Sequence, residues 1–489
     1  MSEEFSLPEE GRTRRRVGLA LGLCALAAIA LVPSGLHDVP GYGSRPALAA
    51  GVAALMAIWW LTEALPIAWT ACAPLVLFPL LGVHGRGVLG GLGAAAEPYV
   101  DAYIFMFLGG MAIGAGMEQR KLHKRIALGI MLAIGTEPRR LLAGVIVATA
   151  TLSLWISNTA TAVMMVPIGV ALLRQLEEAL GRPVRELGTA LMLAIAYAAN
   201  VGGIGTKVGS GTNSIFCGFV EDKLGLEMGF LRYALLGLPF VVLMLPVVYG
   251  VLWRHAKADG AERGPGEGLL RAELAALGRL RGHELAVALV FAATAILWTL
   301  GDPIRRELAP WVLEASGFKM QSKHWEAAVA LAAAAVLLVG RSLSLRSFAR
   351  MPFGTLLLLG GSFSLAAGIE AGGFGATMTR ALAPVATMSL GAQVAIASFA
   401  TVFLTAIASN TAAVNVALNV LPPDLRVLSS TVLAASCDFA LPAGTPPNAI
   451  VFASGYIRLP TMMRIGVLLD VLAATLIVAY VLLYASRLY

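Results

Sequence analysis

The sequence predicts an all-α polytopic membrane protein with about eleven transmembrane helices, two re-entrant hairpins and an inverted-topology repeat. Three observations lead to this prediction. Apolar residues make up 58% of the chain and charged residues 13%, whereas an average soluble domain is roughly 25% charged. Apolar runs long enough to cross a bilayer recur along the chain. The tripeptide Ser-Asn-Thr occurs twice inside such surroundings, at 157–159 and 409–411.

The net charge of +7 does not indicate a nucleic-acid partner. The basic residues cluster in short connectors between apolar runs, where they set membrane topology. The four cysteines stand singly in or beside apolar runs, with no metal-ligand or disulfide spacing, so we expect small buried side chains.

Residues 1–16 form a predicted cytoplasmic tail that ends in the cluster Arg14-Arg15-Arg16. The apolar run 17–35 follows it directly. Nothing after this run resembles a cleavage site, so we expect a retained extra first span rather than a signal peptide.

Eleven runs have the length of a crossing. They are 17–35, 46–64, 66–83, 101–118, 190–220, 230–253, 284–301, 324–340, 353–371, 430–456 and 462–486. With the N-terminus in the cytoplasm, eleven crossings place the C-terminus outside, in a bacterial-type inner membrane.

The segments 140–174 and 390–421, which hold the Ser-Asn-Thr triplets, are apolar on both sides of a polar centre. Each either adds a crossing or enters and leaves on one side as a hairpin. A single crossing at the first would place Arg174, Arg182 and Arg185 outside, against the positive-inside rule. We therefore expect re-entrant hairpins.

Other features recur in matching order. Leu108-Gly109-Gly110 is repeated as Leu359-Gly360-Gly361. We assign 46–254 to repeat 1, 255–283 to a Gly-rich, charged cytoplasmic linker and 284–489 to repeat 2. Five crossings per repeat invert the second copy, so the hairpins open to opposite sides and their tips meet near mid-membrane.

Each hairpin is followed by a broken span, at about 190–220 and 430–456, rich in small residues and proline. Glycine and proline interrupt helical hydrogen bonding and free backbone carbonyls. Such carbonyls coordinate cations, and helix N-termini favour anions. A lone polar triplet is more often a helix cap, but matched pairs indicate one solute site shared by both repeats.

These motifs resemble those of the divalent anion:sodium symporters, the family of dicarboxylate, citrate and sulfate transporters. The resemblance rests on Trp59–Pro66, both triplets, Gly202-Gly203 with Thr206, and the string Thr-Pro-Pro-Asn-Ala-Ile at 445–450. It implies an elevator-type homodimer in lipid, with a scaffold at the dimer contact and a mobile transport domain.

The resemblance also implies the roles of individual residues. The substrate-binding residues would be Ser157, Asn158, Thr159, Ser409, Asn410, Thr411, Thr445 and Pro446. One sodium site would use Ser153, Ser157, Asn158 and Gly209, and the other Thr405, Ala408, Asn410 and Gly444.

The sequence departs from the family pattern at Lys207, Thr212 and Asp438, where the family has an apolar residue, a proline and a small neutral residue. Intramembrane charges are functional candidates. Lys207 and Asp438 are therefore coupling candidates. In one reading the two side chains form an ion pair, or the Lys207 side chain extends to the membrane interface. In the others, Lys207 weakens or replaces the binding of the first sodium ion, or Asp438 carries a proton.

The predicted function is secondary active transport of small di- or tricarboxylates, in particular C4 dicarboxylates, by sodium symport, and not enzymatic catalysis. One alternative is a sodium-independent or proton-linked dicarboxylate exchanger in which Lys207 replaces a cation. An intramembrane hydrolase using Ser157 or Ser409 lacks a base, because all six histidines lie at or near connectors. A receptor or scaffold would need no matched broken spans.

Overall fold

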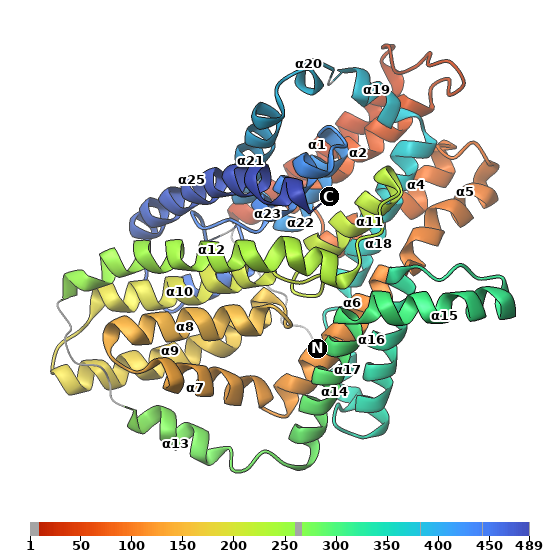
Figure 1. The fold of residues 1–489 in the computed structure, drawn as a ribbon. Helices are drawn as coiled ribbons and strands as arrows, with labels where there is room; N and C mark the ends of the chain where they lie inside the picture. The colour runs from red at the N-terminus through yellow and green to blue at the C-terminus, as the bar shows by residue number, and fades with distance from the viewer. Residues whose placement is uncertain (1–8, 260–266, 382, 443, 489) are drawn as a thin grey trace.

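The computed structural model describes residues 9–259, 267–381, 383–442 and 444–488 (Figure 1). These residues form 25 α-helices and three short 3-10 helices. They contain no β-strand, only an isolated bridge between Val39 and Gly43. The predicted all-α class is confirmed.

The helices up to the linker are as follows. They are α1 (Glu9–Leu31), α2 (Arg45–Thr62), α3 (Ile67–Thr70), α4 (Ala73–Leu81), α5 (Gly87–Ala96), η1 (Glu97–Val100), α6 (Ala102–Gln119), α7 (Leu122–Ile134), α8 (Pro138–Ser153), α9 (Asn158–Leu180), α10 (Arg185–Gly203), α11 (Gly211–Leu224) and α12 (Phe230–Ala256). The linker itself contains η2 (Lys257–Asp259) and α13 (Gly268–Ala276).

The remaining helices complete the second half. They are α14 (Gly282–Thr299), α15 (Gly301–Ser316), α16 (Ser322–Val339), α17 (Leu345–Ala349), α18 (Gly354–Ala371), α19 (Phe374–Ala381), α20 (Ala383–Ala386), α21 (Leu390–Ile407), α22 (Asn410–Val420), α23 (Leu425–Ala435), α24 (Pro446–Phe452), α25 (Leu459–Leu483) and η3 (Ala485–Arg487).

Eight helical stretches in the described part of the chain are long and apolar enough to cross a membrane. They are Arg45–Thr62, Gly87–Gln119, Asn158–Leu180, Phe230–Asp259, Gly282–Thr299, Ser322–Val339, Gly354–Ala371 and Leu459–Arg487. A multi-pass membrane protein is thereby confirmed. The predicted broken spans do not appear among the eight, and each is divided into two helices, α10 with α11 and α23 with α24. The count of eleven and the re-entrant paths stay predictions.

Several short helices lie where the sequence predicted connectors or the tail. α1 begins at Glu9 and so takes in part of the predicted tail. α13 lies inside the predicted linker, and α5, α7 and α15 were not predicted. Apolar run length reveals spans, whereas these helices are short or mix apolar with charged residues.

The two halves repeat the same order of elements. A Gly-Gly helix (α6, α18) precedes a helix–turn–helix (α8–α9, α21–α22), a broken pair (α10–α11, α23–α24) and a long closing helix (α12, α25). α12 packs along α10 and against α25, as Figure 1 shows. α24 packs on α9 and α10 of the other half, while α11 packs on α22 and α23. This exchange brings both broken pairs together at the centre.

Glycine permits close helix packing in both halves. A Cβ added to Gly109 on α6 would overlap the carbonyl of Ala330 on α16, and one added to Gly361 on α18 would overlap the carbonyl of Ala71. Small residues let helix backbones approach closely where van der Waals contact drives association.

We expect Gly109→Ala to destabilise the protein by about 1–3 kcal/mol, because α6 and α16 must separate. Gly129→Ala in α7 is the matched control, since an added Cβ there meets nothing within 4 Å. The control should be neutral or up to about 1 kcal/mol more stable. Thermal unfolding of purified protein in detergent measures both, and equal melting temperatures for the two variants would contradict the packing argument.

Candidate functional site

The two Ser-Asn-Thr triplets form the turns of the two helix–turn–helix units. Ser157 is the N-cap of α9, and its Oγ accepts the N–H of Ala160 at 3.4 Å. Ser409 is the N-cap of α22, and its Oγ accepts the N–H of Ala412 at 3.3 Å. Serine is a preferred N-cap because its oxygen satisfies a free backbone N–H. Each triplet therefore begins a helix.

A hydroxyl behind each turn contacts the same pair of groups in both halves. Ser153 Oγ lies 2.8 Å from Asn158 Oδ1 and 2.7 Å from the carbonyl of Ala199; we call these atoms the first oxygen cluster. In the second oxygen cluster, Thr405 Oγ1 lies 2.8 Å from Asn410 Oδ1 and 2.9 Å from the carbonyl of Ala435.

Each oxygen cluster has more acceptors than protons. A hydroxyl carries one proton, and the two oxygens that face it only accept in this arrangement. One acceptor in each cluster therefore lacks its own proton. Clusters of this kind suit a hard cation such as sodium, which takes oxygen ligands.

Asparagines close the helix breaks. Asn213 Nδ2 donates to the carbonyls of Gly203 (2.7 Å) and Thr206 (2.6 Å). Asn448 Nδ2 donates to the carbonyls of Asp438 (3.1 Å) and Leu441 (3.0 Å). Buried carbonyls freed by a helix break need such partners. The breaks at 204–210 and 436–445 thus have matching architecture.

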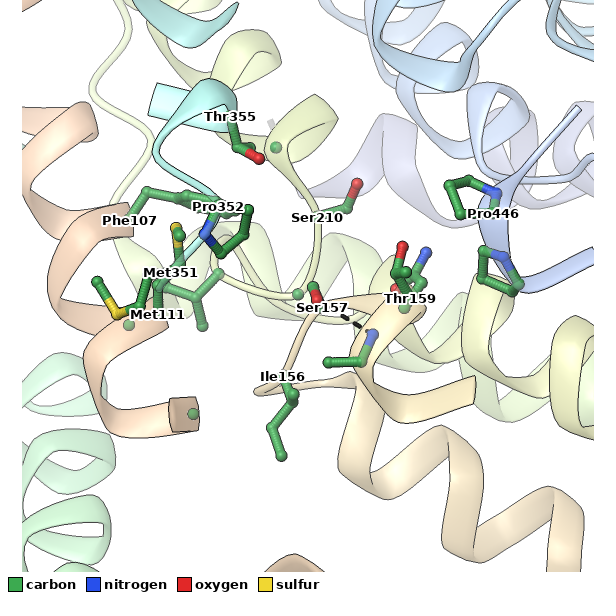
Figure 2. A pocket seen from close by; sticks show the side chains of 18 of the residues that line it. Phe107, Met111, Ile156, Ser157, Thr159, Ser210, Met351, Pro352, Thr355 and Pro446 are labelled. Atoms are coloured by element: carbon green, nitrogen blue, oxygen red, sulfur yellow. Dashed lines mark hydrogen bonds between the residues drawn. The ribbon is translucent and has the colours of Figure 1, made fainter. Parts of the chain in front are cut away.

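Both turns and both breaks border one cavity of about 690 Å³. Figure 2 shows Ser157, Thr159, Ser210 and Pro446 around this cavity. Thr355 of α18 and Met351 of the connector before α18 also line it. The predicted site residues that line it are Ser157, Asn158, Thr159, Gly209, Ser409, Asn410, Thr411, Gly444, Thr445 and Pro446. The structure therefore brings both triplets to one space.

The other predicted cation-site residues lie behind the cavity wall. Ser153 and Thr405 are fully buried in the oxygen clusters, and Ala408 is buried beside the second turn. Gly209 packs closely on the same layer: an added Cβ would lie 2.6 Å from the Gly203 carbonyl oxygen and 3.0 Å from that of Ser153. Only glycine fits there without displacing those oxygens.

The predicted pairing of Lys207 with Asp438 is wrong. Lys207 Nζ donates to Glu326 Oε2 of α16 at 2.7 Å, and both side chains are almost completely buried. Glu326 Oε1 also accepts the N–H of Phe230, and the Lys207 ammonium lies 5.1 Å from the ring centre of Tyr103. Lys207 does not line the cavity. Its charge is neutralised between α16 and the first break.

Thr212, another departure from the family pattern, forms hydrogen bonds with residues next to it in the chain. Its Oγ1 lies 2.9 Å from Ser210 Oγ and donates to Asn213 Oδ1 at 3.2 Å. It thereby orients the asparagine that closes the first break.

Sequence reasoning missed several cavity residues. Asn200 lines the cavity, and its Nδ2 donates to Thr445 Oγ1 at 3.1 Å, which joins the two repeats. Ser210, Thr355 and Arg350 also line it. Asn200 is a polar residue inside a long apolar run, and the same feature identified the Ser-Asn-Thr triplets. Arg350 stands in a predicted connector and carried no such signal.

The described residues contain no group of three or more His, Cys, Asp or Glu side chains placed to hold a metal ion. Candidate cation ligands at the turns are neutral oxygens, which is the chemistry of a sodium site rather than of a transition-metal site.

Fold and site define a multi-pass membrane protein in which two repeats enclose one polar cavity. The family described as the sodium:sulfate symporter transmembrane region matches residues 14–489. The chain therefore belongs to this family, the divalent anion:sodium symporters, and the expected resemblance is confirmed. Members of this family are transporters.

The chain is similar to proteins named sodium-dependent dicarboxylate transporter SdcS. The protein from Staphylococcus saprophyticus is 32% identical over 95% of this chain and 90% of its own length. One from Staphylococcus aureus is 31% identical over 87% of this chain and 83% of its own length.

The solved structure of Neisseria gonorrhoeae MtrF, titled as representing a class of antimetabolite efflux pumps, has a similar fold. Its TM-score is 0.54 at 13% identity, covering 98% of this chain and 96% of that one. At this identity the likeness concerns the fold alone.

We expect Lys207→Met to destabilise the protein by about 3–5 kcal/mol, because it leaves the Glu326 carboxylate buried without its counter-charge. Adding Glu326→Gln should restore much of the lost stability, since glutamine keeps an oxygen for the Phe230 N–H. Melting temperatures in detergent compare the single variant, the double variant and the unaltered protein. A single variant as stable as the unaltered protein, or a double variant no better than the single one, would refute the ion-pair argument.

Thr405→Val should cost about 1–2 kcal/mol, because it removes the hydroxyl donor from buried acceptors at nearly constant shape. Thr405→Ser keeps the hydroxyl and is the matched control, with most of the stability retained. The same melting experiment decides: if serine and valine are equivalent, the hydroxyl has no structural role.

Proposed function

We propose that this chain is a sodium-coupled symporter of small dicarboxylates, most simply C4 dicarboxylates, that works by an elevator movement in a homodimer. The observation that carries the proposal is the shared cavity, which both Ser-Asn-Thr triplets line. The sodium-dependent dicarboxylate transporters to which the chain is similar support the sodium ion and the substrate class.

The substrate anion would bind between helix N-termini. α9, α11 and α22 begin at Asn158, Gly211 and Asn410, and all three residues line the cavity. A helix N-terminus presents free N–H groups and a positive dipole end, which favour carboxylates. In the proposal, the hydroxyls of Thr159 and Thr411 supply further neutral donors to the two ends of the dicarboxylate.

Sodium ions would bind at the two oxygen clusters. We assign the first ion to Ser153, Ser157, Asn158 and Gly209, and the second to Thr405, Ala408, Asn410 and Gly444. The excess of acceptor oxygens over protons in each cluster supports this assignment. Lys207 does not compete for the first site, because its ammonium is paired with Glu326.

Coupling would follow from charge. A dianion at membrane depth is very unfavourable without counter-charge. Among the described cavity-lining residues, Arg350 is the one cationic side chain, and it stands at the edge, in the connector before α18. Sodium bound at the turns would offset charge on the substrate and order the N-termini that bind it, so each ligand raises the affinity for the other.

We propose that the conformation is open to the cytoplasm. The cavity extends to Glu118 and Gln119 at the end of α6, and to Ser347 and Arg350 near α17. One connector follows Gln119, and another joins α17 to α18. The segments at both places carry the basic residues that are expected on the cytoplasmic side of the membrane. The two helix–turn–helix units would then be re-entrant, and the cavity would face outward after the elevator movement.

The exchanger alternative loses its motivation, since Lys207 does not line the cavity and its ammonium is paired with Glu326. The hydrolase alternative is not favoured either. No histidine or lysine belongs to the described cavity lining, so the serine hydroxyls there have no such base beside them.

We expect purified protein in proteoliposomes to accumulate radiolabelled succinate with an inward sodium gradient and not with choline. Asn158→Ala and Asn410→Ala should each lower uptake at least about 30-fold, the effect of losing about 2 kcal/mol of polar contacts. Asn419→Ala is the matched control, because Asn419 lies in α22 outside the cavity lining and bonds only along its own helix.

Uptake that persists unchanged in choline would favour exchange over symport. Near-normal sodium-driven uptake in both Asn158→Ala and Asn410→Ala would discard the site assignment. Loss of uptake in Asn419→Ala as well would show that any asparagine change in α22 disables the protein.

A further inference from the structure

The second helix break contains a buried acid that its surroundings do not satisfy. Asp438 lies between α23 and α24 and has no exposed surface. Neither carboxylate oxygen has a hydrogen-bond partner among the described residues, and no lysine, arginine or histidine there forms an ion pair with it. A buried, unpaired carboxylate is strongly unfavourable. It needs a cation or a proton.

A second acid, Asp470, makes a negative charge on Asp438 more unfavourable. Asp470 on α25 accepts the backbone N–H of Phe439, the residue after Asp438, at 3.0 Å. Asp470 thus has a partner, and as a second acid close by it would repel a charge on Asp438. The groups of the described residues therefore do not balance a charge on the Asp438 carboxylate.

Gly203 and Asp438 occupy the same place relative to the asparagines that close the two breaks. Asn213 and Asn448 close the two breaks, the first through the carbonyl of Gly203 and the second through that of Asp438. Their local backbones differ, because Gly203 is the last residue of α10 whereas Asp438 lies beyond the end of α23. A Cβ added to Gly203 would overlap Asn158 Oδ1 of the first oxygen cluster. A side chain at this place in the first break would therefore reach the first oxygen cluster.

In the second repeat, a direct contact gives the position of the Asp438 carboxylate. The Asp438 carboxylate packs directly on Gly444, where an added Cβ would overlap it. Gly444 lines the cavity, as Gly209 does in the first repeat. The carboxylate thus lies at the wall that the second cation would share.

We propose that Asp438 is a direct, charged ligand of the cation held at the second turn. This inference rests on the proposed sodium coupling and adds to it a residue that the family pattern does not contain. The first site then has only neutral oxygens, whereas the second has a carboxylate. The bound sodium ion satisfies the buried charge that none of the described residues neutralises.

A charged ligand changes the order of binding. A site of neutral oxygens depends on the incoming anion to balance its cation, but a carboxylate balances it in advance. The second site therefore binds sodium tightly before any dicarboxylate is present. The charge on the ligands is a main determinant of cation affinity in oxygen sites.

The test is equilibrium binding of radioactive sodium to purified full-length protein without dicarboxylate, with choline replacing sodium. Asp438→Asn should weaken the tighter sodium-binding phase by about tenfold or more, because it removes the ligand charge at constant shape. Asp438→Ser, smaller and neutral, gives the same result and serves if the asparagine variant does not fold. Asp470→Asn is the matched control: it removes a buried acid but no ligand, and should change sodium affinity by less than about threefold.

Wild-type sodium affinity in Asp438→Asn or Asp438→Ser would overturn the proposal, as would an equal loss in Asp470→Asn. These outcomes leave the proposed function intact if the unaltered protein still shows sodium-driven succinate uptake. Absence of sodium binding and of sodium-driven uptake in the unaltered protein itself would instead overturn both. The two failures are therefore distinguishable.

Discussion

Breaking a helix inside an apolar protein exposes backbone groups that must find partners, and this requirement organises the centre of the molecule. Asn213 and Asn448 meet it by donating two hydrogen bonds each to carbonyls of their own break. With those carbonyls held, the following helices α11 and α24 begin at the cavity. Asn200 then joins the two breaks through Thr445.

The same construction leaves an electrostatic asymmetry between the repeats. Ser153 and Thr405 form equivalent contacts, and Gly209 and Gly444 both line the cavity. Gly203 and Asp438 both offer a carbonyl to the asparagine that closes their break, but Asp438 also carries a carboxylate. In the proposed mechanism the two sodium ions are therefore not interchangeable: one is balanced by the protein and the other by the substrate.

Residues whose role is local could be predicted from the sequence. The repeated triplets, the glycines and the proline string indicated their own helix ends, and their polarity inside apolar runs indicated a shared cavity. The Lys207–Glu326 pair could not be predicted, because the two residues are 119 positions apart. Their meeting depends on how α16 is aligned with the first break. α7, α13 and α15 escaped prediction because apolar run length identifies spans and not short helices beside them.

The central claim is that the two turns enclose one anion together with sodium. The most direct measurement is a cryo-electron microscopy structure in lipid nanodiscs with sodium and succinate. The account predicts density for the dicarboxylate between the helix N-termini at Asn158 and Asn410. Density at another place, or two turns too far apart to contact one ligand, would contradict it.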